Sequence, residues 1–341
     1  MDQRLEKIIK VEWKAQELQK RFAESGPLIE RLTAITPANL DITKKTSTPS
    51  NYLIIQGSFD PPTLSHLELL SRSINLRKKI NPLDSIEVVF LFSLSHVDKK
   101  FNVLNRSLLG YRVEMLENLV KTLNLPVSIS IGLSNVARYI DLIEAAQQYF
   151  KNIKNLTFIM GTDVFKKVLD SHYYSEPIKT ILPLIFNADY FVAGRKEVFS
   201  KKEFTLYLKN HLPGDYHQKI HFLSLPKHFR FLNATSIRES YSDKRVIQET
   251  GIHPVIEHYL GKDNLYRSTS KWMATKITIQ LVVQLTLEAE KEQTIANEIL
   301  NLLLPEVESD AIFQQQLINE YQTEKNREIV KRWNQLLGLI S

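Results

Sequence analysis

The segment Gly57–His66, GSFDPPTLSH, carries residue types and a spacing that suit the binding of an anion. It directly follows a short apolar run and precedes an amphipathic stretch, so we expect a loop between a strand and a helix. The backbone N–H groups and the dipole of such a helix point at whatever occupies the loop. Gly57 lets the backbone approach a ligand closely, and His66 falls near the first helical turn, where its side chain faces a bound phosphate. The alternative is that Ser65 caps the helix and His66 is a partly exposed helical residue.

A second pattern of this kind is Leu232–Arg238, LNATSIR, which follows the last apolar run. Thr235 and Ser236 stand at a helix start, where hydroxyl and backbone N–H groups hold phosphate oxygens. Arg238 follows one turn later, and a guanidinium clamps such oxygens with two parallel hydrogen bonds. A capping box formed by Ser236 and Glu239 explains the same residues structurally, and one helix start can serve both purposes.

The elements that position these two segments are short apolar runs that alternate with amphipathic stretches. The runs are β-branched or aromatic and largely apolar on both faces, as buried parallel strands are. They are Tyr52–Gln56, Ile86–Phe92, Val127–Ile131, Leu156–Met160, Tyr190–Ala193 and Ile220–Leu223. The stretches with helical spacing include Leu67–Lys79, Leu108–Leu123, Tyr139–Phe150 and Val164–Leu169. Strands that alternate with helices predict an α/β fold with a Rossmann-like, doubly wound parallel sheet.

Glycine and charge divide the 341 residues into three parts. Eight of the ten glycines lie within 51–267. Residues 1–50 carry nine Lys/Arg against seven Asp/Glu, and residues 268–341 carry seven against ten, so the total net charge of +6 leaves +7 on the middle part. We therefore expect the ligand-binding domain at 51–267, where the positive charge favours anionic ligands.

The two flanks are predicted to be helical extensions. Leu5–Phe22 has helical spacing, and Thr36–Ser50 has the composition of a linker. Apolar residues recur at spacings of three and four residues on both sides of Pro305, so a helical hairpin is expected over 268–341. We expect these extensions to pack on the central domain or to form an interface between copies of the chain.

The composition excludes several kinds of protein. The chain has no cysteine, which excludes disulfides, thiolate zinc sites, iron–sulfur clusters and a cysteine nucleophile. No signal peptide is visible at the N-terminus, and the longest apolar stretch, Ile277–Leu287, is too short for a membrane span. Because the basic residues do not form a run with interleaved aromatics, a nucleic-acid partner is not expected either. A cytoplasmic protein is the resulting expectation.

The first loop resembles the GxFxPx(T/H)xGH loop of the adenylyltransferases in the nucleotidyltransferase superfamily. Thr63 and His66 match the first and last signature positions, whereas Ser65 replaces the family's glycine. Leu232–Arg238 is similar to the family's ISSTxxR motif, with Asn233 and Ala234 in place of the serine pair. The residues for which the resemblance implies contacts to the phosphates of ATP are Gly57, Ser58, Phe59, Ser65, Thr235 and Ser236.

Further segments resemble motifs of the pyridine-nucleotide branch of this family, and they occur along the chain in the order in which that branch has them. Phe158–Asp163 resembles a strand ending in GTD, which implies nucleotide contacts from Gly161 and Asp163. Tyr111–Met115 resembles the RxxM helix, and Gly251–Tyr266 is similar to the closing pattern VPxxVxxYIxxxxLY. The resemblance thus covers about 51–267 and identifies this part as a nucleotidyltransferase catalytic domain.

The acceptor side departs from the family pattern. The family's YT pair appears as Tyr139 and Ile140, and the tryptophan that follows GTD is absent, with His172–Tyr174 in that region. Lys100 falls where the family carries a phosphate-contacting lysine, and Arg195 ends a strand that in the family ends in a basic residue. These matches imply acceptor contacts from Lys100, Tyr139, Ile140 and Arg195.

The resemblance implies transfer of AMP from ATP to the phosphate of nicotinate or nicotinamide mononucleotide, with release of pyrophosphate, in NAD biosynthesis. His66 would donate to the α-phosphate, Thr63 would support that contact, and Arg238 would hold the β- and γ-phosphates. Mg²⁺ would be held by phosphate oxygens and water, without a metal site of the protein's own. Two alternatives remain: another phosphorylated acceptor such as phosphopantetheine, or a nucleotide-binding regulator whose site is weakened by Ser65.

Overall fold

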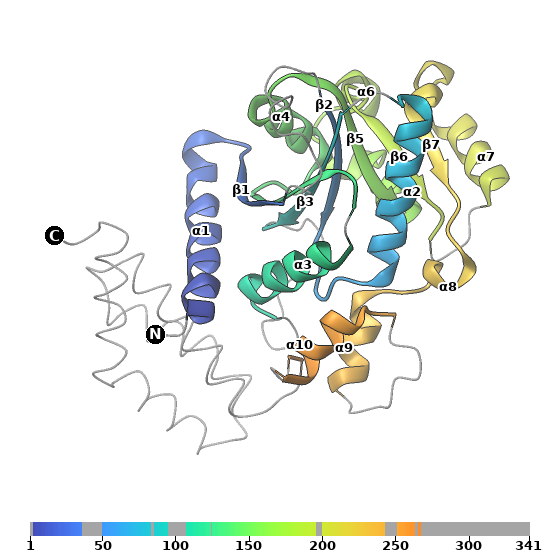
Figure 1. Cartoon of the computed structure of the whole chain (residues 1–341). Coiled ribbons are helices and arrows are strands. Elements are labelled where there is room, and N and C mark those ends of the chain that lie inside the picture. The colour runs from blue at the N-terminus through green and yellow to red at the C-terminus, as the bar shows by residue number, and fades with distance from the viewer. Residues whose placement is uncertain are drawn as a thin grey trace, which may run out of the picture.

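A mostly parallel sheet with helices on both faces forms the centre of the molecule (Figure 1). The computed structural model describes residues 3–35, 50–82, 85–94, 107–123, 125–195, 200–242, 251–262 and 265–266. The strands are β1 (Ile29–Ile35), β2 (Ser50–Gly57), β3 (Ser85–Ser93), β4 (Ser128–Ser134), β5 (Ile153–Gly161), β6 (Asp189–Ala193) and β7 (Ile220–Leu223). The α-helices are α1 (Gln3–Ser25), α2 (Leu64–Ile80), α3 (Leu109–Leu123), α4 (Tyr139–Tyr149), α5 (Thr162–Val168), α6 (Ile178–Ile185), α7 (Lys201–His211), α8 (Lys227–Arg230), α9 (Ala234–Ser242) and α10 (Pro254–Lys262).

The strand order is β1-β4-β3-β2-β5-β6-β7, and every neighbouring pair is parallel except β1 with β4. The chain therefore proceeds from β2 outward to β3 and β4, then returns to the other side of β2 and continues through β5 to β7. This reversal is that of the Rossmann-like sheet. The six predicted strands and the four predicted helices between them are all present, so the predicted fold class is confirmed.

Successive side chains of the parallel strands enter two separate apolar layers, as the alternation of side chains along a strand requires. In β2, Leu53 and Ile55 pack with α1, α2 and α3, whereas Tyr52 and Ile54 pack with α4 to α7. Nearly all of these side chains are fully buried. The apolar character on both faces of the strands is thus explained by helices on both faces of the sheet.

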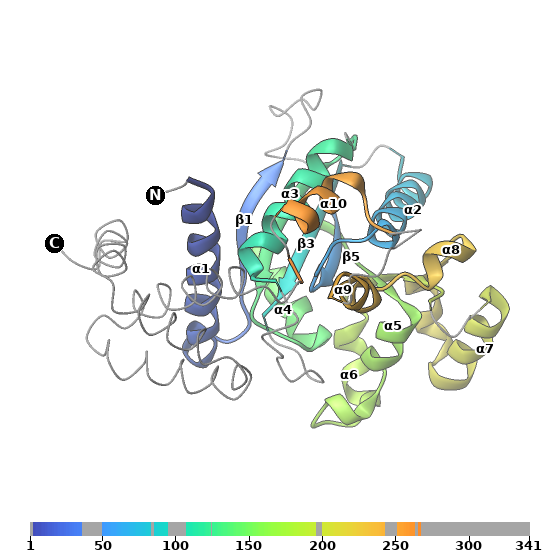
Figure 2. The same cartoon turned by 90° about the horizontal axis from the view of Figure 1, so that it is seen from below.

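The N-terminal part of the chain differs from the prediction of a helix followed only by a linker. The predicted helix is present as α1, but β1 follows it and extends the sheet beside β4. Figure 2 shows α1 along the outer side of this edge. Of the predicted linker Thr36–Ser50, Ser50 instead begins β2, and the other residues lie outside the described part of the chain. The predicted hairpin over 268–341 also lies outside it.

Helix α1 is fixed to α3 by ion pairs and by a close backbone approach. Arg4 pairs with Glu114 at 2.8 Å, and the carboxylate of Glu12 accepts the backbone N–H of Gly110 at 2.8 Å. A Cβ at Gly110 would stand 2.7 Å from the backbone of Ile8, so only glycine permits this contact. The described part of the N-terminal extension is therefore packed as part of the α/β unit.

Candidate functional site

The candidate site lies where the strand order reverses. Strands β2 and β5 are parallel neighbours, and they end at Gly57 and Gly161 on the same edge of the sheet. The chain leaves β2 toward one face of the sheet and β5 toward the other, because α2 and α5 pack on opposite faces. We call the region between these two loops the crevice, after the position at which such sheets bind ligands. Open α/β sheets bind their ligands at such a point, outside the carboxyl ends of the strands.

Thr63 caps α2, and His66 completes this cap from the third helical position. The backbone N–H of Thr63 donates to His66 Nδ1 at 3.0 Å, and Thr63 Oγ1 lies 2.8 Å from the same nitrogen. An imidazole takes here the place that Glu or Gln has in a capping box. The alternative in which Ser65 caps the helix is therefore wrong, although His66 is indeed a partly exposed helical residue.

This cap determines the tautomer of His66. A nitrogen that accepts a backbone N–H carries no proton, so the proton of the neutral ring is on Nε2. Burial and, to a smaller extent, the positive charge of Arg195 lower the pKa of His66 from 6.5 to about 3. At neutral pH the side chain is thus an uncharged imidazole that offers one N–H donor from Nε2.

The loop before α2 is tightly folded around Phe59. This residue has φ of 42°, a conformation that non-glycine residues rarely adopt, and its ring is 1% exposed. The ring makes edge contacts with Phe92 and with His66, at centroid distances of 5.1 and 5.2 Å. Phe59 therefore packs in the core beneath the loop and supports His66, and its backbone is the part that remains for the predicted contact to a phosphate.

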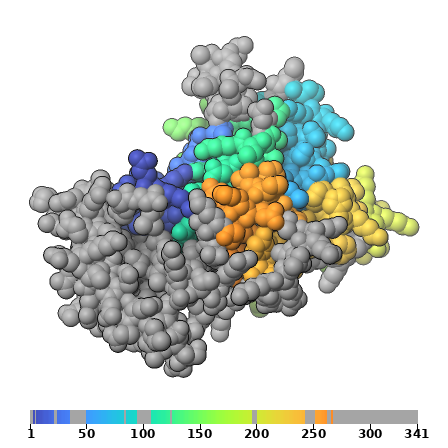
Figure 3. Space-filling model, turned by 60° about the horizontal axis from the view of Figure 1, so that its bottom comes forward, coloured from blue at the N-terminus to red at the C-terminus, as the bar shows by residue number. Residues whose placement is uncertain are grey.

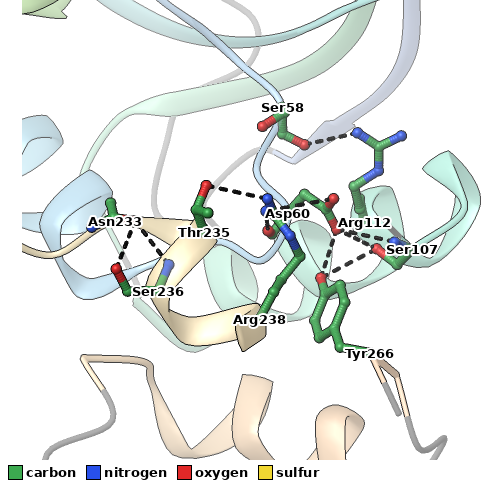
Figure 4. A network of polar contacts seen from close by, with 9 residues as sticks. All are labelled: Ser58, Asp60, Ser107, Arg112, Asn233, Thr235, Ser236, Arg238 and Tyr266. Carbon is green, nitrogen blue, oxygen red and sulfur yellow. Dashed lines mark hydrogen bonds and ion pairs between the residues drawn. The ribbon is translucent and has the colours of Figure 1, made fainter. Parts of the chain in front are cut away.

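Ser58 and Ser65 lie on the two sides of this loop. The carbonyl of Ser58 accepts a hydrogen bond from Arg112 Nη1 at 3.1 Å (Figure 4). Ser65 is 3% exposed. Because its side chain is buried in the first turn of α2, the predicted contact to a phosphate is left to its backbone.

Asp60 joins the loop to distant parts of the chain. Its carboxylate is completely buried, and Oδ1 accepts hydrogen bonds from Ser107 Oγ at 2.7 Å and from the Tyr266 hydroxyl at 2.6 Å. Arg238 Nη1 donates to the Asp60 carbonyl oxygen and lies 3.8 Å from Asp60 Oδ2. Figure 4 shows Arg238 and Tyr266 approaching Asp60 from different segments.

The start of α9 brings the second predicted motif to the same loop. Asn233 Oδ1 accepts the backbone N–H of Ser236 at 2.9 Å and the hydroxyl of Ser236 at 3.1 Å, so Asn233 caps the helix, not the pair Ser236 and Glu239. Thr235 Oγ1 accepts a hydrogen bond from Arg238 Nη2 at 3.2 Å. Thr235 and Ser236 are both exposed at this helix start, where an anion would meet their hydroxyls.

Gly161, Asp163 and Arg195 form the opposite side of the crevice. A Cβ at Gly161 would stand 2.4 Å from Asp163 Oδ1 and 2.9 Å from Arg195 Cδ, so glycine is needed for these side chains to lie where they do. Arg195 Nη2 donates to the carbonyl oxygen of Leu232 at 2.7 Å, which connects β6 to the start of α9. Asp163 Oδ1 and Arg195 Nε are buried without a hydrogen-bond partner, as is Asp60 Oδ2 in the first loop. Buried polar atoms in native proteins are nearly always hydrogen-bonded, so unpaired ones call for an explanation.

The expected acceptor residues divide between two places. Arg195 lies with Gly161 and close enough to His66 to lower its pKa. Tyr139 packs edge-on against Phe158 at 5.5 Å, and burial and the negative charge of Asp163 raise its pKa above the usual 10. Ile140 lines a recess of about 280 Å³ beside this tyrosine.

Tyr174 is the aromatic residue of the 172–174 region that reaches this recess. Its hydroxyl donates to the carbonyl of Val168 at 2.8 Å, and burial raises its pKa to about 12. His172 is exposed and makes an edge contact with Tyr173. Arg138 and Asp141 also line the recess, and they pair with each other at 2.7 and 2.8 Å.

The structure thus brings together residues that are far apart in sequence, and it adds some that no sequence motif indicates. Arg238, Gly161, Asp163 and Arg195 lie at the same edge of the sheet as Thr63 and His66. Lys100 lies outside the described residues. Asp60, Ser107 and Arg112 were missed as site residues. Asp60 is the only acidic residue of Gly57–His66, which was a signal for it, but no local pattern identifies Ser107.

No group of three or more His, Asp or Glu side chains that could hold a metal ion occurs among the described residues. In the same part of the chain, no helix is long and apolar enough to cross a membrane. A scan against protein-family models finds no match to the chain. A search of curated proteins also finds no match.

Proposed function

We propose that the protein is an adenylyltransferase that moves AMP from ATP to the phosphate of nicotinate or nicotinamide mononucleotide and releases pyrophosphate. The observation that carries the proposal is the state of His66, a neutral imidazole whose Nδ1 is occupied by the Thr63 cap. Its Nε2–H is a preorganised donor at the point where a doubly wound sheet binds its ligands. Such a donor stabilises the charge that develops on the α-phosphate during transfer.

The reaction needs no nucleophile from the protein because the acceptor phosphate itself attacks the α-phosphorus. A new bond forms between an acceptor oxygen and the α-phosphorus, the bond to the bridging oxygen breaks, and the electron pair leaves with pyrophosphate. Catalysis then depends on positioning and on the stabilisation of charge. His66, Arg195 and Arg238 fit this requirement, since they are hydrogen-bond donors and two of them are cations.

The leaving pyrophosphate is proposed to bind at the start of α9. Arg238 has five N–H donors, and its hydrogen bonds to Asp60 and Thr235 use two of them. Arg195 lies across the crevice with Nε buried and unpartnered. Two guanidinium groups on opposite sides of the crevice suit a triphosphate, which carries several negative charges.

Mg²⁺ is proposed to enter with the triphosphate and to be held by phosphate oxygens and water. Asp163 is the residue of the site that would face it, because its Oδ1 is buried without a hydrogen-bond partner. The ion would neutralise charge on the triphosphate. On the acceptor side, Ile140 and Tyr174 line the recess beside Tyr139, and an aromatic side chain there can stack on a flat ring.

The test is an assay of pyrophosphate release by the full-length chain with ATP, Mg²⁺ and a panel of phosphorylated acceptors. The panel contains nicotinate mononucleotide, nicotinamide mononucleotide and phosphopantetheine. Release that depends on a pyridine mononucleotide supports the proposal, and release that depends on phosphopantetheine alone overturns the acceptor. Binding of ATP without release for any acceptor would instead identify a nucleotide-binding regulator.

A further inference from the structure

Asp60 is contacted by groups from three other segments of the chain, through Ser107, Arg238 and Tyr266. Oδ1 accepts from Ser107 Oγ, from the Ser107 backbone N–H at 3.3 Å and from the Tyr266 hydroxyl. The other oxygen, Oδ2, is buried without a hydrogen-bond partner and faces Arg238 Nη1. An ionised carboxylate in this position is stabilised by the positive charge of the arginine, and in turn it holds that arginine.

Tyr266 reaches Asp60 from the end of the closing segment, which comprises residues 251–262 and 265–266. The backbone of this segment also contacts the first loop, because the N–H of Leu64 donates to the carbonyl of Gly251 at 2.9 Å. Figure 3 shows the segment in orange between α3 in green and the α8–α9 region in yellow. Burial and the charge of Asp60 raise the pKa of Tyr266, so its hydroxyl keeps the proton that it donates.

Backbone strain occurs at both ends of this contact. Phe59, next to Asp60, has φ of 42°, and Tyr266 has φ of 68°. Non-glycine residues remain in this region only where the surrounding structure compels them, and such positions gather at ligand sites and switches. Tyr266, one of the strained residues, thus donates its hydrogen bond to Asp60, the neighbour of the other.

We propose that Tyr266 is a positioning residue for Arg238, which acts through Asp60 to hold the guanidinium where it binds the pyrophosphate part of ATP. The hydroxyl of Tyr266 fixes the Asp60 carboxylate. Oδ2 of this carboxylate and the backbone carbonyl oxygen of Asp60 then hold Nη1 of Arg238. Arg238 then presents its remaining N–H groups to the ligand without first losing conformational freedom. This inference rests on the proposed function in one respect only, namely that Arg238 binds the phosphates of ATP.

The test measures the affinity of the full-length chain for inorganic pyrophosphate and for ATP by isothermal titration calorimetry. Tyr266→Phe removes only the hydroxyl, and we expect it to weaken pyrophosphate binding about tenfold, as for the loss of a hydrogen bond to a charged group. In an Arg238→Ala background the same change should have less than about a twofold effect, because the positioned group is gone. Ser107→Ala should also weaken pyrophosphate binding, and this effect should also disappear in the Arg238→Ala background.

Tyr259→Phe is the matched control. Tyr259 lies on α10 in the same closing segment, but its hydroxyl bonds Asn118 on α3 instead of Asp60. We expect this variant to lower the melting temperature while leaving pyrophosphate affinity within about twofold of wild type. The contrast between the two tyrosines separates positioning of Arg238 from a general loosening of the segment.

The inference is overturned if Tyr266→Phe weakens binding no more than Tyr259→Phe, or if its effect is unchanged in the Arg238→Ala background. Should Tyr266→Phe fail to fold, Ser107→Ala is compared in the wild-type and Arg238→Ala backgrounds, and the same criteria apply. A wild-type chain that binds neither pyrophosphate nor ATP also overturns it. Wild-type binding with the expected pattern but without AMP transfer refutes the proposed function and leaves this inference standing.

Discussion

The backbone N–H of Thr63 donates to Nδ1 of His66 at 3.0 Å, and this one hydrogen bond links the folding of α2 to the chemistry of the site. The same contact caps the helix and fixes the tautomer of the neutral ring, which carries its proton on Nε2. The folding role and the proposed catalytic role of His66 therefore have to be separated by experiment.

His66→Ala should reduce turnover by about 10²–10³-fold while ATP affinity stays within about tenfold, because the contact to the α-phosphate develops mainly in the transition state. The variant should also lose roughly 1 kcal/mol of unfolding free energy with the helix cap. Steady-state kinetics, calorimetric ATP binding and chemical denaturation measure the three quantities.

His66→Gln is the control for this change, because glutamine is a normal residue of a capping box. It should restore most of the lost unfolding free energy without restoring turnover. Near-normal turnover in His66→Ala would refute the assigned role. A loss of turnover that follows unfolding free energy across both variants would show that the role is structural.

The lowered pKa of His66 predicts how stability depends on pH. Between pH 6.5 and about 3 the unfolded chain binds a proton that the folded chain does not, so stability falls as the pH decreases through this window. Above pH 6.5 the contribution is fully present. At pH 5 the loss from this group is roughly 1–2 kcal/mol.

Urea denaturation of wild type and of His66→Gln at pH 7.5 and pH 5 measures this effect. Wild type should lose about 1–2 kcal/mol more than the variant between the two pH values. Equal losses would show that the ring is not held in its neutral form. Because folded His66 stays neutral near pH 6.5, its protonation should not lower turnover as the pH decreases through that value.

Gly161→Ala should displace Asp163 and Arg195, because the added Cβ would stand 2.4 Å from one side chain and 2.9 Å from the other. The backbone itself tolerates alanine, since φ at Gly161 is −82°. We expect ATP affinity to fall about tenfold, as for one lost charge-assisted hydrogen bond. Calorimetric titration with ATP measures it.

Gly214→Ala is the matched control, because a Cβ there meets nothing within 4 Å. It should leave ATP affinity unchanged within the error of the titration. If both glycine variants bind ATP like wild type, Asp163 and Arg195 do not contact the nucleotide.

The sequence is sufficient for the α/β fold because that fold follows from local patterns. Apolar runs such as Ile86–Phe92 need a partner layer on each side, and the helices between them supply it. Strand β1 escaped prediction because it joins the sheet as an antiparallel edge strand, and its exposed positions interrupt the apolar pattern. Its place depends on pairing with β4, which the local sequence does not encode.

The two segments proposed to bind phosphates are also visible in the sequence, but the capping residues expected there are wrong. Thr63 and Asn233 cap α2 and α9, whereas Ser65 and Ser236 were the candidates. Several polar residues at each helix start can serve as the cap, and tertiary contacts decide among them. The approach of Tyr266 to Asp60 spans 206 positions of the chain, so it follows from the assembled sheet and from no local pattern.

The most direct test of the central claim follows the fate of the phosphates of labelled ATP. ATP labelled at the α-phosphate and ATP labelled at the γ-phosphate are each incubated with the full-length chain, Mg²⁺ and a pyridine mononucleotide, and the products are separated by chromatography. We predict that the α-label appears in a dinucleotide and the γ-label in pyrophosphate. Transfer of the γ-label to the acceptor, or no labelled dinucleotide at all, would contradict the account.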